Sequence, residues 1–347
     1  MPQQCIVIGA SAGGFEVVVN IASQLPADLP VPVFVVMHIP ADHHSYLPEI
    51  LAKAGPLSAV HPEDGAKIET GMIYVAPPDH HLLIDDHHVA VKRGPKENGF
   101  RPSIDALFRS AAYSYGPEAI GVVLSGALHD GTSGLWSIKR LGGTAIVQDP
   151  YEAKYASMPR SALEFVEADY KVRSEEVAAL LTRLAQEPSA QQTGRRDDVE
   201  AGLEERIAKE VQIAAGTNIS QKTILELGEL TPFTCPECHG TLTRIKEGKF
   251  SRFRCHTGHG FTEDALLEAV MASTGEMIWQ VTRGLQEVEL LLEHIGQHIR
   301  EAGDPGRAEK FFATANDIEK QASRFQEIAL KHQSLSTDKI SEHQPTD

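Results

Sequence analysis

Short apolar runs alternate with helical patterns over the first half of the chain. Five runs are rich in Val and Ile and are closed by Gly, Pro or Asp, and they are CIVIGA (5–10), VPVFVVMH (31–38), MIYVAP (72–77), AIGVVLSG (119–126) and GTAIVQD (143–149). Segments with apolar residues at helical spacing lie between several of them. This alternation predicts an α/β fold with a mainly parallel, doubly wound sheet covered by helices. Residues 81–94 predict instead an antiparallel hairpin that turns near Asp85 and Asp86.

A different pattern follows residue 187. Residues 186–198 are polar and without period, which is typical of a linker, and a charged helix is expected over about 198–215. From residue 263 to about 332 the chain is predicted to be helical, with a turn at AGDPG (302–306). Two stripes with steps of three and four predict an antiparallel helical hairpin. The stripes consist of Ile278, Val281, Leu285, Val288, Leu292, Ile295 and Ile299, then of Phe311, Ala315, Ile318, Ala322, Phe325 and Ala329.

Composition and charge indicate a globular protein and argue against a membrane protein or a nucleic-acid-binding protein. The chain of 347 residues is 41% hydrophobic and 23% charged, as is usual for a globular protein. No apolar run is long enough to span a membrane, and the N-terminus lacks the pattern of a secretory signal. We therefore expect a cytoplasmic protein without membrane insertion. The formal net charge of −16 makes nucleic acid an unexpected partner.

The first apolar run leads into Gly-Ala-Ser-Ala-Gly-Gly, residues 9–14. This loop matches neither the G-x-G-x-x-G turn nor the lysine-bearing P-loop, so a phosphate site is not indicated. A serine on a tight strand-to-helix turn suits a nucleophile, because backbone N–H groups at the helix N-terminus can stabilise an oxyanion. The alternative is that Ser11 only caps the helix.

Two more residues at strand ends complete a possible catalytic triad. His38 ends the second apolar run, and Asp130 follows the fourth. Carboxyl ends of parallel strands meet at one edge of a sheet, so these side chains are expected near Ser11. A serine nucleophile needs a base, and the base needs an orienting carboxylate. Chance placement of one of sixteen histidines and an ordinary Asp-Gly turn are the alternatives.

Several of these segments resemble blocks of the CheB-type protein-glutamate methylesterases. The blocks lie in the family's order over about residues 5–185, and they include IGASAGG, MHIP, FRPSIDALFRSAA, GVVLSGALHDGTSG, GGTAIVQDP and ASMPRSAL. The resemblance implies hydrolysis of methyl-glutamate esters on chemoreceptors, and some members also deamidate receptor glutamines. It implies Ser11 as nucleophile, His38 as general base and Asp130 as carboxylate, with an acyl-enzyme and no catalytic cofactor.

The chain also departs from the family. Ala12 stands where the family commonly has Thr, and residues 126–131 are GALHDG where it commonly has G-M-G-N-D-G. The typical member begins with a receiver domain, whereas this chain starts at the catalytic strand. The expected partners are methyl-accepting chemoreceptor-type proteins, a separate response regulator and, through the C-terminal helices, further copies of the chain. A signalling scaffold that binds proteins through its esterase fold and tail is the alternative function.

Three of the four cysteines fall in one short segment. CPECHGTL and FRCHTGHGF have the spacing of a zinc ribbon, with thiolate and imidazole ligands suited to structural Zn²⁺. The predicted ligands are Cys235, Cys238, Cys255 and His259. His256 and His239 are alternative fourth ligands, a redox pair of the first two cysteines is the alternative chemistry, and Cys5 is expected in the core.

These patterns divide the chain into five predicted parts. They are a methylesterase-type catalytic domain at 1–187, a linker and helix at 188–230, a zinc-ribbon-like module at 231–262, a helical hairpin at 263–333 and a disordered tail at 334–347. The module contains five Lys or Arg residues and four phenylalanines, which is also compatible with nucleic-acid binding. The alternative is that these aromatic residues cover a small core.

Overall fold

The computed structural model of the protein describes residues 3–40, 42–187, 202–217 and 220–333. Its contacts divide the chain into two compact units, residues 1–265 and 266–347. The predicted tail at 334–347 lies outside the described residues, as does most of the predicted linker. The finer domain boundaries remain predictions.

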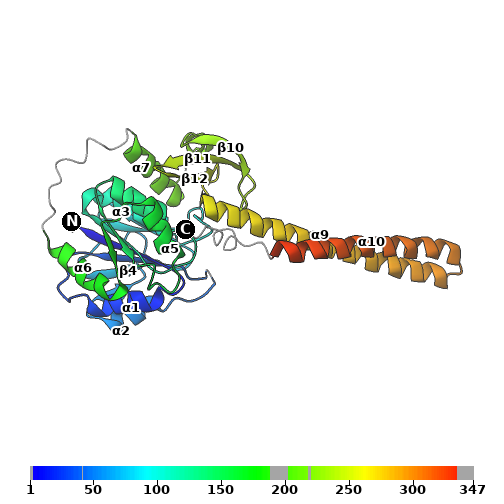
Figure 1. Ribbon diagram of the computed structural model, residues 1–347, viewed down its shortest axis with the longest axis horizontal. Coiled ribbons are helices and arrows are strands. Elements are labelled where there is room, and N and C mark those ends of the chain that lie inside the picture. Colours follow the sequence, from blue (N-terminus) through cyan, green and yellow to red (C-terminus); the bar gives the residue numbers. More distant parts are fainter. Residues whose placement is uncertain (1–2, 41, 188–201, 218–219, 334–347) are drawn as a thin grey trace, which may run out of the picture. The chain divides into compact units, whose positions relative to one another are not determined.

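A seven-stranded sheet forms the centre of the first unit (Figure 1). The strand order is β3-β4-β2-β1-β7-β8-β9, and every pair of neighbours is parallel. The strands are β1 (Cys5–Ala10), β2 (Val33–Met37), β3 (Ser58–Val60), β4 (Met72–Val75), β7 (Ala119–Val123), β8 (Thr144–Gln148) and β9 (Tyr170–Val172). The predicted fold class is therefore confirmed.

Helices cover both faces of this sheet, because successive residues of a strand point to opposite sides. In β1, Ile6 and Ile8 pack on one side and Val7 packs on the other. The first side carries α1 (Phe15–Gln24), α2 (Leu47–Ala54) and α6 (Ser174–Gln186). The second side carries α3 (Ile104–Tyr115), α4 (Thr132–Arg140) and α5 (Ser157–Phe165), and a 3-10 turn, η1 (Gly116–Glu118), follows α3.

Two further elements pack against α3. β5 (His81–Asp85) and β6 (His88–Lys92) form the antiparallel hairpin predicted from the sequence. The charged helix is α7 (Leu203–Ala214), and its Leu203 and Ile207 are buried in the core beside α3. Part of the segment between the sheet and the cysteines therefore belongs to the packed first unit.

The cysteine-rich segment folds into a small antiparallel sheet of four strands, hereafter the ribbon, which a short helix, α8 (Gln221–Leu225), precedes. The strands, in spatial order, are β10 (Glu229–Thr234), β11 (Thr241–Glu247), β12 (Phe250–Cys255) and β13 (Gly260–Thr262). Leu242, Ile245, Phe253 and Phe261 are buried in the ribbon, whereas Phe250 is buried against the core of the parallel-sheet domain. Four such residues make a thin core, so the fold of the ribbon depends on additional interactions.

Buried ion pairs, hereafter the ion network, join the ribbon to α3 and α7. The network contains three acidic and three basic side chains, which are Glu97, Glu210, Glu247, Arg109, Arg252 and Arg254. Arg252 bonds Glu210 and Glu247, each at 2.6 Å, and Arg254 bonds Glu97 at 3.0 Å. The formal charges cancel, and each charge needs its partner because an unpaired buried charge is strongly destabilising.

The ion network predicts a specific dependence of stability on pH. Burial alone would raise the pKa of Glu210, but the charges of Arg252, Arg109 and Arg254 outweigh burial and lower the pKa to about 2. The ionised carboxylate therefore stabilises the fold by about 3 kcal/mol above its ordinary pKa, and this contribution is lost as the pH falls toward 2. The difference in unfolding free energy between the native protein and Glu210→Gln should shrink over that range.

Guanidinium unfolding of both proteins at a series of pH values measures this difference. Loss of the predicted metal in acid would also release Arg252 and Arg254 with the ribbon, so hydrogen exchange in β12 must show at each pH that these partners of Glu210 are still ordered. A difference that stays constant from neutral pH to pH 2 would contradict the assigned charge on Glu210.

The second unit is a pair of long helices, α9 (Glu263–Glu301) and α10 (Pro305–Gln333), of which α9 begins in the first unit. The predicted helical hairpin is confirmed (Figure 1). α10 packs through alanines seven residues apart, which are Ala308, Ala315, Ala322 and Ala329. A Cβ on Gly296 of α9 would lie 2.8 Å from the ring of Phe312, so the helices approach closely there.

The face of α9 that packs matches the predicted stripe only in part, since Ile278, Leu285, Leu292 and Ile299 are half-buried. Thr282 and Gly296 are buried, whereas Val281, Val288 and Ile295 are 45%, 42% and 41% exposed. Small residues such as Thr282 and Gly296 occupy the packed positions of α9 because the alanines of α10 allow the two helices to approach closely. Within the described residues, no helix is both long and apolar enough to cross a membrane.

Candidate active site and metal centre

The candidate nucleophile lies on the turn that joins β1 to α1. Gly13 has a φ of 71°, a conformation that favours glycine, and Gly14 is the N-cap of α1. A Cβ on Gly14 would lie 2.8 Å from the Cβ of Ala10, so a larger residue does not fit. Because Gly14 occupies the N-cap, the alternative role of Ser11 as the helix cap is wrong.

His38 lies between Ser11 and Asp130. Nδ1 of His38 is 3.1 Å from Oγ of Ser11, and Nε2 is 2.9 Å from Oδ2 of Asp130. The His38 side chain is 6% exposed and Asp130 is fully buried. The structure thus brings the three predicted residues together at the carboxyl edge of the sheet. In the usual Ser-His-Asp arrangement Nε2 faces the serine, so the ring has the opposite orientation here.

The N-terminus of α3 holds Asp130. The carboxylate accepts hydrogen bonds from the N–H of Ile104 at 2.7 Å, from Oγ of Ser103 at 3.0 Å and from Nδ2 of Asn98 at 3.0 Å. Burial alone would raise the pKa of Asp130, but the hydrogen bond and charge of His38 and the N–H of Ile104 hold it below its ordinary value. An ionised Asp130 accepts the Nε2 proton, which leaves Nδ1 to accept the proton of Ser11.

A second buried carboxyl group, Asp105, lies beside Asp130. Burial raises the pKa of Asp105 well above its ordinary range, and the negative charge of Asp130 raises it further. Oδ1 of Asp105 accepts the N–H groups of Gly131 and Gly134 at 3.0 and 2.6 Å. The two carboxyl groups together therefore carry one negative charge, on Asp130. Asp105 fixes the backbone that follows Asp130.

Two residues of the site, Asn98 and Phe100, were not predicted from the sequence. The ring of Phe100 stacks on His38, with centroids 3.7 Å apart and an angle of 8° between the planes. Both residues belong to a turn closed by two backbone hydrogen bonds between Glu97 and Phe100. The Asn-Gly pair in this segment indicates a turn, but no local pattern shows what the turn contacts.

The loop before Asp130 differs from the family pattern in its backbone as well as its residues. Leu128 has a φ of 67°, and the family commonly has glycine at this position. The left-handed conformation costs a residue with a side chain about 1 to 2 kcal/mol. Leu128 therefore introduces strain in the loop that carries the triad carboxylate.

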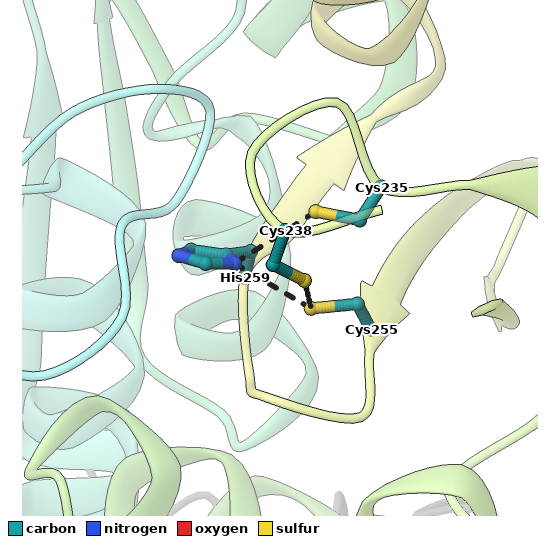
Figure 2. Close-up of side chains that lie close together, drawn as sticks. All are labelled: Cys235, Cys238, Cys255 and His259. Carbon is teal, nitrogen blue, oxygen red and sulfur yellow. Dashed lines mark hydrogen bonds between the residues drawn. The ribbon is translucent and has the colours of Figure 1, made fainter. Parts of the chain in front are cut away.

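The four predicted metal ligands gather at one end of the ribbon (Figure 2). Their ligand atoms, which belong to Cys235, Cys238, Cys255 and His259, all lie within 4.8 Å of one another. Nδ1 of His259 is 3.7 Å from Sγ of Cys235 and 3.6 Å from Sγ of Cys255. Ligands about 2.3 Å from a tetrahedral Zn²⁺ are about 3.8 Å apart, so donor type and spacing fit this ion.

The residues around the four ligands help to decide which histidine is the fourth ligand. Among the residues that the structure describes, neither His256 nor His239 joins the group of four, so the geometry favours His259 as the fourth ligand. Oγ1 of Thr257 lies 3.0 Å from Sγ of Cys255 and 3.2 Å from Sγ of Cys238, where it can donate to a thiolate. Cys5 is buried in the sheet core, as expected.

The positive charge of the ribbon is partly internal. Arg252 and Arg254 are buried in the ion network and pair with glutamates. Phe253 and Phe261 are buried as well, whereas Phe233 is 52% exposed. The four buried side chains are therefore not available for phosphates or bases, which weakens the nucleic-acid alternative.

Comparison with known proteins agrees with this geometry. The profile of the CheB methylesterase family matches residues 6–181. A Leptospira interrogans protein named "Putative protein-glutamate methylesterase/protein-glutamine glutaminase" is 43% identical over 187 residues, which are 54% of this chain and 97% of that protein. Protein-glutamate methylesterase/protein-glutamine glutaminase 3 of Anaeromyxobacter dehalogenans is 40% identical over 45% of this chain and 46% of its own length.

A solved structure is similar as well. The crystal structure of the Thermotoga maritima CheB methylesterase catalytic domain is 32% identical, with a TM-score of 0.51. The similarity covers 52% of this chain and 98% of that chain. The match ends near α6, so the ribbon and the helix pair lie outside the similar region.

Proposed function

This chain belongs to the CheB methylesterase family, and we propose that it demethylates glutamate methyl esters on chemoreceptor-type signalling proteins. The observation that carries the proposal is the contact of His38 with both Ser11 and Asp130. The names of the relatives add glutamine deamidation, which we include as a second reaction of the same site. A separate response regulator is proposed as a further partner.

The geometry supports an acyl-enzyme mechanism. Oγ of Ser11 attacks the ester carbonyl carbon while Nδ1 of His38 takes the hydroxyl proton. Methanol then leaves with that proton, and water activated by the same nitrogen hydrolyses the acyl-enzyme to release the glutamate side chain. Asp130 stabilises the charged imidazole throughout. Backbone N–H groups near Ala12 and Ala127, at the N-terminus of α1 and in the loop after β7, are proposed to bind the oxyanion.

Release of methanol from methylated receptor fragments tests this proposal. The native chain should release methanol, and Ser11→Ala should not. Ser23→Ala, which changes an exposed serine of α1, is the matched control and should behave like the native chain. Equal release by native protein and Ser11→Ala would contradict the serine mechanism.

We also propose that the four ligands of the ribbon hold one structural Zn²⁺. All four positions of a tetrahedral ion would be filled by protein atoms, so the ion would fix the ribbon rather than act on substrate. Thiolates and imidazole bind Zn²⁺ most strongly when deprotonated. The catalytic steps above use no metal.

The exposed face of α9 favours a role in assembly besides catalysis. Seven of the nine exposed large apolar residues of α9 follow steps of three, four or seven, and they are Leu267, Val270, Met277, Val281, Val288, Leu291 and Ile295, whereas Trp279 and Leu290 lie off this stripe. Such a stripe is the seam that a helical partner covers in a coiled coil. We propose that a second copy of the chain supplies this partner.

Charged substitutions on the stripe should therefore disperse the assembly. The triple variant Val281→Glu, Val288→Glu and Ile295→Glu should sediment as a monomer where the native chain forms a dimer. A control with Glu at the exposed position Gln286, on the opposite side of α9, adds charge away from the stripe and should remain dimeric. Hydrolysis of a small methyl ester should not change. A monomeric native chain would contradict the proposed self-association.

A further inference from the structure

We infer that the ribbon positions the catalytic carboxylate, and that Asn98 is the residue through which it does so. This inference rests on the proposed function of Ser11, His38 and Asp130. It concerns a positioning residue, since Asn98 contacts the triad and not the reacting atoms. The connection runs from β13 to the turn at residues 97–100 and from that turn to the triad.

Asn98 forms hydrogen bonds to the ribbon through its backbone N–H and its side-chain oxygen. Its backbone N–H donates to the carbonyl oxygen of Gly260 at 2.7 Å. Its Oδ1 accepts the N–H of Thr262 at 2.8 Å. Both partners belong to β13, and Gly260 directly follows the predicted metal ligand His259.

Asn98 forms hydrogen bonds to the active site through its side-chain nitrogen, Nδ2. Nδ2 donates to Oδ1 of Asp130 at 3.0 Å and to Oδ2 of Asp105 at 2.9 Å. The residue is 7% exposed, so water has little access to replace these bonds. Each hydrogen-bonding group of the side chain thus has a fixed partner, and a shift of β13 changes the position of the donor to Asp130.

A second anchor fixes the same turn. Glu97 bonds Arg254 of β12 at 3.0 Å, and it also pairs with Arg109 of α3. Phe100, at the other end of the turn, stacks on His38. The ribbon therefore holds one short turn that contacts both the base and the carboxylate of the triad.

A third contact reaches the residue next to Asp130. Nε2 of His129 lies 3.3 Å from Oδ2 of Asp264, which immediately follows the ribbon in the first turn of α9. The loop that carries Asp130 is therefore bonded to the ribbon through Asn98 and to the helix turn that directly follows the ribbon through Asp264. Loss of the ribbon's order removes both, while the sheet that carries Ser11 and His38 remains.

Substitution of Asn98 tests this inference directly. Asn98→Gly keeps the φ of 52° without strain and removes the amide. We expect kcat for a small methyl ester to fall about 10- to 100-fold with little change in KM, because the carboxylate loses its position while the binding surface stays. Asn98→Asp retains the acceptor for Thr262 but not the donor to Asp130, and should lose activity as well. Zinc content should not change in either variant.

Thr231→Val is the matched control. Oγ1 of Thr231 donates to the carbonyl of Leu242 at 2.8 Å, so its loss perturbs the ribbon without touching the turn. This variant should keep the native kcat. A fall in kcat equal to that of Asn98→Gly would mean that ribbon stability alone matters and would overturn the role of Asn98.

A readout without substrate separates the inference from the proposed function. In full-length Ser11→Ala, the proton between Nε2 of His38 and Asp130 should give a downfield NMR resonance. It should shift or broaden when Asn98→Gly is added, and also when Cys235→Ser removes the metal. No response to either change, or no such resonance in the parent protein, would overturn the inference. If the resonance in Ser11→Ala responds to both changes but the native chain hydrolyses no methyl ester, the inference stands and the proposed function is wrong.

Discussion

Substituting any member of the triad should reduce kcat for ester hydrolysis by about 10⁴-fold or more. Ser11→Ala removes the nucleophile, and His38→Ala removes the base that takes its proton. Asp130→Asn keeps the size of the side chain but replaces a carboxylate oxygen with an amide. The imidazole ring is then held in the wrong tautomer, because its Nε2 proton loses its acceptor. Steady-state kinetics on a methyl ester substrate measure these losses.

Double substitutions test whether the three residues act as a unit. Ser11→Ala combined with His38→Ala should be no slower than the worse single variant, because a base without its nucleophile has no function. His43→Ala is the matched histidine control, since His43 lies on an exposed loop and its side chain pairs with Asp42. Additive losses, or a loss in His43→Ala comparable to that in His38→Ala, would contradict the assignment.

The strands at the centre of the sheet were predictable because they are buried on both faces. β1, β2 and β7 lie entirely in the core and therefore consist of unbroken apolar runs. β3 and β9 were missed, because each has three residues and lies at an edge of the sheet with mixed exposure. Short edge strands carry too little apolar pattern to stand out from a loop.

The triad candidates were predictable for a topological reason. Residues that follow parallel strands meet at one edge, so Ser11, His38 and Asp130 could be grouped without coordinates. The orientation of the imidazole was not predictable, because the sequence does not show which ring nitrogen faces the serine. The contact of Asn98 with Thr262 joins residues 164 positions apart, and no local pattern reveals it.

In the ribbon, the spacing of Cys and His residues predicts the metal ligands but not the ion pairs that the neighbouring residues form. The C-x-x-C and C-x-x-x-H motifs indicated the four residues that the structure brings together. The same segment's Arg252 and Arg254 were counted among its five basic residues, with no indication of where they lie. They are buried because Glu97 and Glu210, which lie on separate segments of the chain, supply opposite charges within the core. Charge complementarity of this kind depends on the tertiary fold.

Removal of the predicted metal should have the largest effect on stability. We expect purified native chain to contain one Zn²⁺ per molecule, and Cys235→Ser to lose it. Binding of structural zinc contributes on the order of 10 kcal/mol in small zinc modules, which exceeds what a thin apolar core supplies. The ribbon should therefore lose its order, with rapid hydrogen exchange in β11 and β12. The parallel sheet should stay folded, because its core is formed by its own strands and helices.

Three variants separate the metal centre from general damage. Cys5→Ala removes a thiol from the sheet core and should leave the zinc content unchanged. His259→Ala should lose the metal, whereas His256→Ala should retain it, because among the described residues it is His259 whose nitrogen lies with the three sulfurs. Metal analysis with exchange measurements on the same samples decides the matter. Native protein without zinc, or Cys235→Ser with a full complement of it, would show that the cluster is not a zinc site, since a tetrahedral ion cannot keep its affinity after losing a thiolate ligand.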